Sequence, residues 1–99
     1  MDKNLENLLF EEFPVLYRER EQTSMQYGFR CGNGWYDLIR RMSARLEEYR
    51  LKSCSALRIT TVKMKFSELR VYAHQGDNSE LIEDVDNLLS EFILESRRI

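Results

Sequence analysis

The 99-residue chain is poor in the residues that most often build metal sites and disulfide frameworks. It has two cysteines, Cys31 and Cys54, and one histidine, His74. They form no Cys-x-x-Cys or His-x-x-x-His pair, so the usual ligands of a structural zinc ion are missing. We expect both cysteines to be reduced thiols, and we expect no metal and no other cofactor.

The chain also lacks the segments that mark several other classes of protein. No apolar run approaches the length of about 20 residues that crosses a bilayer. The acidic, interrupted stretch 1–13 does not resemble a signal peptide. The Gly-Asn-Gly stretch at 32–34 is too short for a glycine-rich phosphate loop. These absences favour a soluble, cytoplasmic protein without membrane contact.

Catalytic groups are scarce as well. A nucleophile needs a general base within reach, and Cys31 with His74 is the one plausible pair. Cys31 precedes an expected helix N-terminus, where a thiolate could be stabilised. The simpler interpretation is a small buried cysteine and a histidine at a hairpin edge. We therefore expect a protein that is not an enzyme.

The residues that are present suit one globular domain over residues 1–99. Apolar residues make up 42% of the chain, which is close to the average for globular domains. A chain of this length buries about two-thirds of its unfolded surface, so it can fold without disulfides or metal.

The net charge of −2 hides a strong polarity along the chain. Residues 1–29 carry a net charge of −3 and residues 77–99 carry −5, whereas ten basic and four acidic groups give residues 30–76 a charge of +6. The basic middle and the acidic ends could complement each other within the fold. Alternatively, the surface is dipolar, with one basic face for an acidic partner. The total charge is too low for a general coat on nucleic acid.

The chain begins and ends with a predicted helix. Apolar residues at helical spacing predict a first helix over residues 4–13, which Pro14 ends. The last helix follows a turn at 75–78, where Asp77 and Glu80 resemble a capping box. Its apolar stripe consists of Leu81, Ile82, Val85, Leu88, Leu89, Phe92 and Ile93.

A central helix is predicted from Trp35 to about Lys52. The opposite side of this helix is mostly basic, and Arg41 and Arg45 lie one turn apart on it. Its apolar stripe consists of Trp35, Leu38, Ile39, Met42, Leu46 and Tyr49.

Two regions alternate apolar and polar residues, as strands do. In residues 25–31, four apolar side chains would point one way, and Gly28 would allow close approach of another backbone. The stretch VKMKFSELRVY at 62–72 predicts a hairpin. A change of phase at Thr60–Thr61 indicates a β-bulge.

A two-residue loop at Ser67–Glu68 gives this hairpin two distinct faces. The expected register places Lys65 opposite Arg70 and Lys63 opposite Tyr72. Ser67 is a poor residue for such a turn, which requires positive φ and favours glycine. The core face would hold Val62, Met64, Phe66, Leu69 and Val71, and the outer face Lys63, Lys65, Arg70 and Tyr72.

The order helix, strand, helix, strand, strand, helix predicts an α+β fold in two layers. We expect a three-stranded, mainly antiparallel sheet. The two longer helices would cover its apolar face, with the N-terminal helix in addition. The outer face would remain open, and it could also include Arg30.

Two blocks of the sequence, YGFRCGNGWYDLI and TTVKMKFSELRVY, resemble a family of small proteins from tailed phages and prophages. The family pattern has Gly-Trp followed by Leu-Ile, and then a hairpin with the motif Val-Lys-x-Lys-Phe-Gly-x-Leu-Arg-aromatic-Tyr. The matching positions are Gly34, Trp35, Leu38, Ile39, Val62, Lys63, Lys65, Phe66, Leu69, Arg70 and Tyr72. Ser67 replaces the turn glycine and Val71 replaces an aromatic residue. Many relatives carry a cysteine-rich tail that this chain lacks, so no metal role carries over. The resemblance implies a phage or prophage accessory protein without catalytic activity.

The outer face carries the functional hypothesis. Cations around an aromatic ring, as in Lys63, Lys65, Arg70 and Tyr72, are typical of nucleic-acid-binding sheet surfaces. The like-charged pair Lys65–Arg70 is unfavourable unless an anion lies between the two side chains. The structural alternative is an edge hairpin whose lysines only prevent aggregation.

Two functions of different class follow. The first is a phage-encoded or prophage-encoded inhibitor, for example an anti-CRISPR, that binds a host protein such as a defence nuclease or a CRISPR effector. The outer sheet face would make the contact, or more weakly the helix face of Arg41 and Arg45, or the acidic last helix. The second is a nucleic-acid-binding accessory module that uses the same sheet face. A monomer and a homodimer both remain open.

Overall fold

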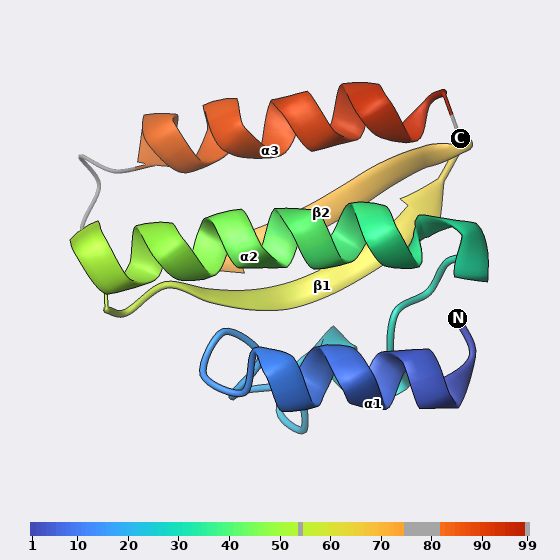
Figure 1. Ribbon diagram of the computed structural model, residues 1–99, viewed down its shortest axis with the longest axis horizontal. Helices are drawn as coiled ribbons and strands as arrows, with labels where there is room; N and C mark the ends of the chain where they lie inside the picture. Colours follow the sequence, from blue (N-terminus) through green and yellow to red (C-terminus); the bar gives the residue numbers. More distant parts are fainter. Residues whose placement is uncertain (54, 75–81, 99) are drawn as a thin grey trace.

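The computed structural model describes residues 1–53, 55–74 and 82–98. Its helices are α1 (Lys3–Glu12), α2 (Tyr36–Ser53) and α3 (Ile82–Ser96), and its strands are β1 (Arg58–Lys65) and β2 (Glu68–His74). In Figure 1, α2 lies across the hairpin between α1 and α3, and α3 runs antiparallel to α2. The fold is α+β, as expected.

The sheet that the structure describes has two strands, so the predicted three-stranded sheet is wrong. Ser24–Tyr27 forms a 3-10 turn instead of a strand, and Tyr27 is 70% exposed. Arg30 alone joins the sheet, through an isolated parallel bridge to Lys63. The alternating pattern resembled a strand because Met25 and Phe29 are both buried. The backbone between them is not extended, since Gly28 has a positive φ.

Gly28 is the point at which this segment meets α1. Its φ of 77° lies in a region that side chains disfavour, and a Cβ there would lie 1.6 Å from Oε2 of Glu6. The same oxygen accepts a hydrogen bond from the backbone N–H of Phe29 at 2.7 Å. The close approach predicted for Gly28 is therefore present, although the approaching group is a carboxylate rather than another backbone.

The two β-strands pair in a different register from the predicted one. Lys65 lies opposite Glu68 and Lys63 lies opposite Arg70, so the turn residues are Phe66–Ser67. The predicted pair Lys65–Arg70 is wrong. The observed register pairs Lys65 with an opposite charge beside the turn, and it places the like charges of Lys63 and Arg70 opposite each other instead.

Two further predictions for the hairpin have different outcomes. The register shifts between Ile59 and Thr61, which confirms the β-bulge. Met64 and Phe66 are 50% and 85% exposed, so their assignment to the core is wrong. Phe66 belongs to the turn, which extends beyond the side chains that α2 and α3 bury.

The core lies between α2 and the inner face of the hairpin. The stripe predicted for α2 is buried from Trp35 to Leu46, and Tyr49 is half-buried. On the hairpin, Ile59, Val62 and Leu69 are 0–1% exposed. The side chains of α3 that close this core are Val85, Leu89 and Phe92.

The C-terminal end of α3 is attached to the beginning of β2. The buried Ser96 hydroxyl accepts a hydrogen bond from the N–H of Leu69 at 3.1 Å. Arg97 donates from Nε to Oε2 of Glu68 at 2.6 Å. The capping box predicted for Asp77 and Glu80 lies outside the described residues.

Both turn residues have positive φ, 55° for Phe66 and 61° for Ser67, although neither is glycine. We predict that Ser67→Gly stabilises the protein by about 0.5–1 kcal/mol, because glycine adopts this conformation without the steric penalty of a Cβ. Urea denaturation would measure the change. A lower free energy of unfolding in the variant would contradict the assigned turn.

Gly28→Ala should reduce stability by about 3 kcal/mol or more, because it adds backbone strain and displaces the Glu6 carboxylate from the Phe29 N–H. Gly32→Ala is the matched control, since a Cβ at Gly32 would meet no atom within 4 Å. Thermal unfolding of both variants, followed by circular dichroism, would test the prediction. Equal melting temperatures for the two variants would contradict it.

Candidate functional site

Three cations form a row across the outer face of the hairpin. Arg30 bridges Lys63 in parallel, and Lys63 pairs with Arg70 in the antiparallel register. Directly paired residues point to the same side of a sheet, so all three side chains share one face. Two backbone hydrogen bonds hold Arg30 in place, one to the carbonyl of Val62 at 3.1 Å and one from the N–H of Met64 at 2.9 Å. We call Arg30, Lys63 and Arg70 the cation row.

Lys65 and Tyr72 lie on the same face as the cation row. The observed pairs are Lys65 with Glu68 and Tyr72 with Thr61. The register differs from the predicted one by two residues, which preserves the alternation. The four residues predicted for the outer face therefore do share it. Arg30, which the alternation of residues 25–31 offered as a further member of this face, joins them through its bridge to Lys63.

An exposed aromatic ring accompanies the cations. Tyr72 is 54% exposed, and Nζ of Lys63 lies 5.8 Å from the centre of its ring. This distance suits a cation–π contact, which is worth about 0.5–1 kcal/mol at an exposed site. The contact holds the lysine beside the ring although Tyr72 is not its direct partner in the sheet.

Acidic groups neutralise only part of this face. Glu68 is the one acidic residue of β1 and β2, both of which the structure describes in full. It lies 3.6 Å from Nη2 of Arg70 and also pairs with Arg97. Within the described residues, Arg30, Lys63 and Lys65 have no ion pair. The face therefore retains an excess of positive charge.

The basic side of α2 is a weaker candidate than the sequence indicated. Arg41 donates from Nε to Asp37 at 2.9 Å and from Nη1 to Glu95 of α3 at 3.1 Å. These bonds raise the pKa of Arg41, and the bond from Arg41 lowers the pKa of Glu95. Arg41 thus joins α2 to α3. Arg45 is exposed and makes no ion pair in the part of the chain that the structure describes.

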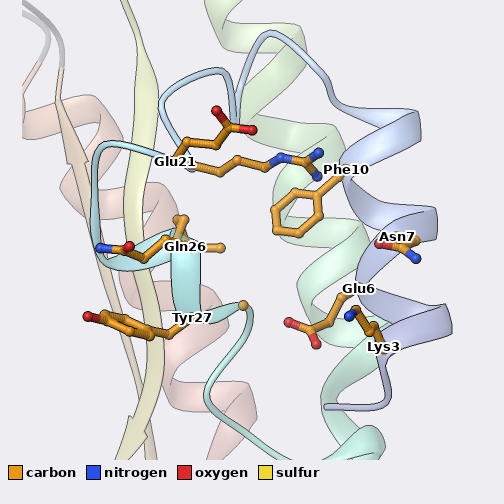
Figure 2. A pocket seen from close by; sticks show the side chains of 10 residues that line it. Lys3, Glu6, Asn7, Phe10, Glu21, Gln26 and Tyr27 are labelled. Carbon is orange, nitrogen blue, oxygen red and sulfur yellow. The ribbon is translucent and has the colours of Figure 1, made fainter.

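The sequence did not indicate a groove of about 500 Å³ between α1 and the segment 20–28. Figure 2 shows side chains from α1 on one side of it and Glu21, Gln26 and Tyr27 on the other. The guanidinium of Arg20 lies 4.5 Å from the centre of the Phe10 ring. The acidic and basic side chains that line the groove are equal in number, and its lining contains no nucleophile beside a general base. The lining residues are Lys3, Glu6, Asn7, Phe10, Arg20, Glu21, Met25, Gln26, Tyr27 and Gly28.

The structure does not bring Cys31 and His74 together. His74 pairs with Arg58, whereas Arg30, the neighbour of Cys31, pairs with Lys63. The two partners on β1, Arg58 and Lys63, are five positions apart along the strand, which corresponds to about 17 Å. Cys54 lies outside the described residues.

Metal-binding and membrane-spanning features are absent from the part of the chain that is described. No three side chains among His, Cys, Asp and Glu come together there as a metal site. None of its helices combines the length and the apolar character that crossing a bilayer requires.

Comparison with known proteins identifies no relative of this chain. No protein-family model, curated protein or solved structure matches this chain.

Cys31 should behave as an unreactive thiol, because burial raises its pKa to about 11. The N-terminal ammonium group lowers this pKa, but its effect is weaker than that of burial. The thiolate fraction at pH 8 would be about 0.1%, compared with about a quarter for an unperturbed thiol. In a Cys54→Ser background, we expect alkylation by iodoacetamide at pH 8 to be at least about 100-fold slower in the folded than in the urea-unfolded protein. Similar rates in the two states would contradict this assignment.

Proposed function

We propose that this chain is a non-enzymatic interaction protein that binds an acidic surface of a partner protein. The observation that carries this proposal is the cation row of Arg30, Lys63 and Arg70 on the outer sheet face. Like charges in adjacent strands repel one another, and each such pair reduces stability slightly. Carboxylates of a partner would replace that repulsion with attraction. The row is therefore better suited to a complex than to the free protein.

The neighbouring side chains support the same proposal. Lys65 extends the positive charge toward the turn, and Tyr72 adds an exposed aromatic ring. Aromatic residues and arginines are enriched where protein interfaces gain most of their energy. Long-range attraction is weak because the whole chain has a net charge of −2. Binding would depend on local charge complementarity, which also gives specificity.

For the partner, we propose a host defence protein such as a nuclease or a CRISPR effector. The two sequence blocks that resemble phage and prophage proteins include Lys63, Lys65, Arg70 and Tyr72. An inhibitor acts by occupying a surface, so it requires no catalytic group of its own. The cation row would dock on an acidic region of such a protein.

Nucleic acid is the second candidate partner. The contact between Lys63 and the ring of Tyr72 favours it, because bases stack on exposed aromatic rings beside cations. The small negative net charge disfavours it, since non-specific affinity for nucleic acid comes mainly from neutralised phosphates. We therefore place it second.

Reversal of one charge in the cation row tests the proposal. Lys63→Glu should weaken capture of the partner from a nuclease-treated host lysate by about tenfold, because it adds a repulsive charge at the centre of the contact. Lys3→Glu is the matched control, since it makes the same change of charge at an exposed position of α1, away from the outer face. Quantitative mass spectrometry of the captured proteins would compare both variants with the original chain.

The same variants distinguish the two partners. For a protein partner, a 20-nucleotide oligo-dT strand should not be retarded by the original chain at low salt, and Lys63→Glu should abolish protection of phage on defended hosts. Retardation of the strand, lost in Lys63→Glu, would favour nucleic acid. Equal capture by both variants would remove the outer face from the proposal.

A further inference from the structure

The tip of the hairpin exposes an aromatic side chain that the fold does not use. Phe66 is 85% exposed, which makes it the most exposed large apolar residue in the described part of the chain. Met64, two residues before it, is 50% exposed. Single exposed apolar residues are common, so exposure alone says little. The backbone conformation at this position is more informative.

Phenylalanine is an unfavourable residue for this position. Its φ of 55° places its Cβ close to the following carbonyl oxygen, at a cost of about 1–2 kcal/mol. Turns of this kind favour Asn-Gly, which adopts the same conformation with little strain. Neither packing nor turn geometry therefore accounts for phenylalanine at the tip. Strained residues that the fold does not require occur most often at functional sites.

A lysine lies beside the exposed ring. Nζ of Lys65 lies 5.6 Å from the centre of the Phe66 ring. Lys63, which belongs to the cation row, lies two residues before Lys65 in β1. An apolar projection with cations at its base complements an apolar pocket with carboxylates at its rim.

We propose that Phe66 is an anchor that inserts into an apolar pocket, rimmed by carboxylates, on the partner protein. This inference rests on the proposed function, and it specifies which feature of the partner the hairpin tip recognises. Lys65 and the cation row contact the rim, while the ring of Phe66 fills the pocket. Aromatic residues in such pockets dominate the energy of many protein interfaces.

A nucleic-acid partner would use this tip differently. Stacking on bases needs rings that lie along the track of the phosphates, and Tyr72 is the ring in that position. Phe66 lies in the turn at the end of the hairpin, three residues after Lys63 of the cation row. A projecting side chain fits a concave protein surface better than an extended strand.

Two turn variants separate the role of the ring from the role of the turn. Ser67→Gly relieves strain and keeps Phe66, whereas the double variant Phe66→Asn with Ser67→Gly relieves strain and removes the ring. We expect both variants to melt at a higher temperature than the original chain. We expect Ser67→Gly to capture the partner from nuclease-treated host lysate at the original level, and the double variant to capture at least tenfold less.

The outcomes decide between the two levels of the proposal. Loss of capture in the double variant alone supports the anchor, since a better-folded protein that binds less cannot owe the loss to unfolding. Retained capture in the double variant, together with loss in Lys63→Glu, overturns the anchor and leaves the proposed function intact. Loss of capture in Ser67→Gly also overturns the anchor, because turn geometry would then be responsible. Failure of the original chain to capture any protein refutes the proposed function and the anchor with it.

Binding to the oligo-dT strand provides the remaining comparison. The anchor predicts no retardation of this strand by the original chain or by either turn variant. Retardation that the double variant loses would assign the Phe66 ring to base stacking, and would overturn the protein pocket.

Discussion

Two backbone hydrogen bonds between residue 30 and β1 attach the segment before α2 to the hairpin. Arg30 donates to Val62 and accepts from Met64, which brings an irregular segment against the edge of the hairpin. A hairpin of two strands is only marginally stable by itself, so this bridge and the helices that cover the inner face are both needed. The same segment meets α1 at Gly28, where the Glu6 carboxylate caps the N–H of Phe29. The segment thereby connects the first helix to the sheet and places a third cation beside Lys63.

The cation row illustrates how a fold can create a site at a small cost in stability. Burial of Met25 and Phe29 on either side of Gly28 favours docking of the segment, and this burial outweighs the repulsion between neighbouring charges on the outer face. Glu68 reduces the repulsion at the Arg70 end of the row only, and it shares its carboxylate with Arg97. On the proposed function, the partner supplies carboxylates to Arg30 and Lys63, which have no ion pair within the described residues. The strained, exposed Phe66 at the nearby turn fits the same interpretation.

The sequence predicted the parts of this fold that depend on strong periodicity. The stripe on α2 and the alternation within the hairpin were clear, so the helix and the outer hairpin face were predicted correctly, whereas Met64 and Phe66 were wrongly assigned to the core face. The segment 25–31 was mistaken for a strand, because burial of Met25 and Phe29 across a 3-10 turn produces the same spacing as alternation. The register could not be predicted, because turn preferences disfavour positive φ at Phe66 and the Ser96 contact with Leu69 comes from a distant helix. For the site, Lys63, Lys65, Arg70 and Tyr72 followed from alternation, which also offered Arg30 as a further member. The state of Arg41 could not be predicted, because it depends on Glu95 of a distant helix.

Lysine footprinting tests the central claim most directly, because the four lysines of the chain divide evenly between the proposed contact and the rest of the surface. Lys63 and Lys65 lie on the outer face, whereas Lys3 lies on α1 and Lys52 near the end of α2. The protein would be acetylated briefly, alone and in nuclease-treated host lysate, and the modification of each lysine measured by mass spectrometry. The proposed contact predicts that acetylation of Lys63 and Lys65 falls in the lysate while that of Lys3 and Lys52 is unchanged. Protection of Lys3 or Lys52 without protection of Lys63 and Lys65 would contradict it.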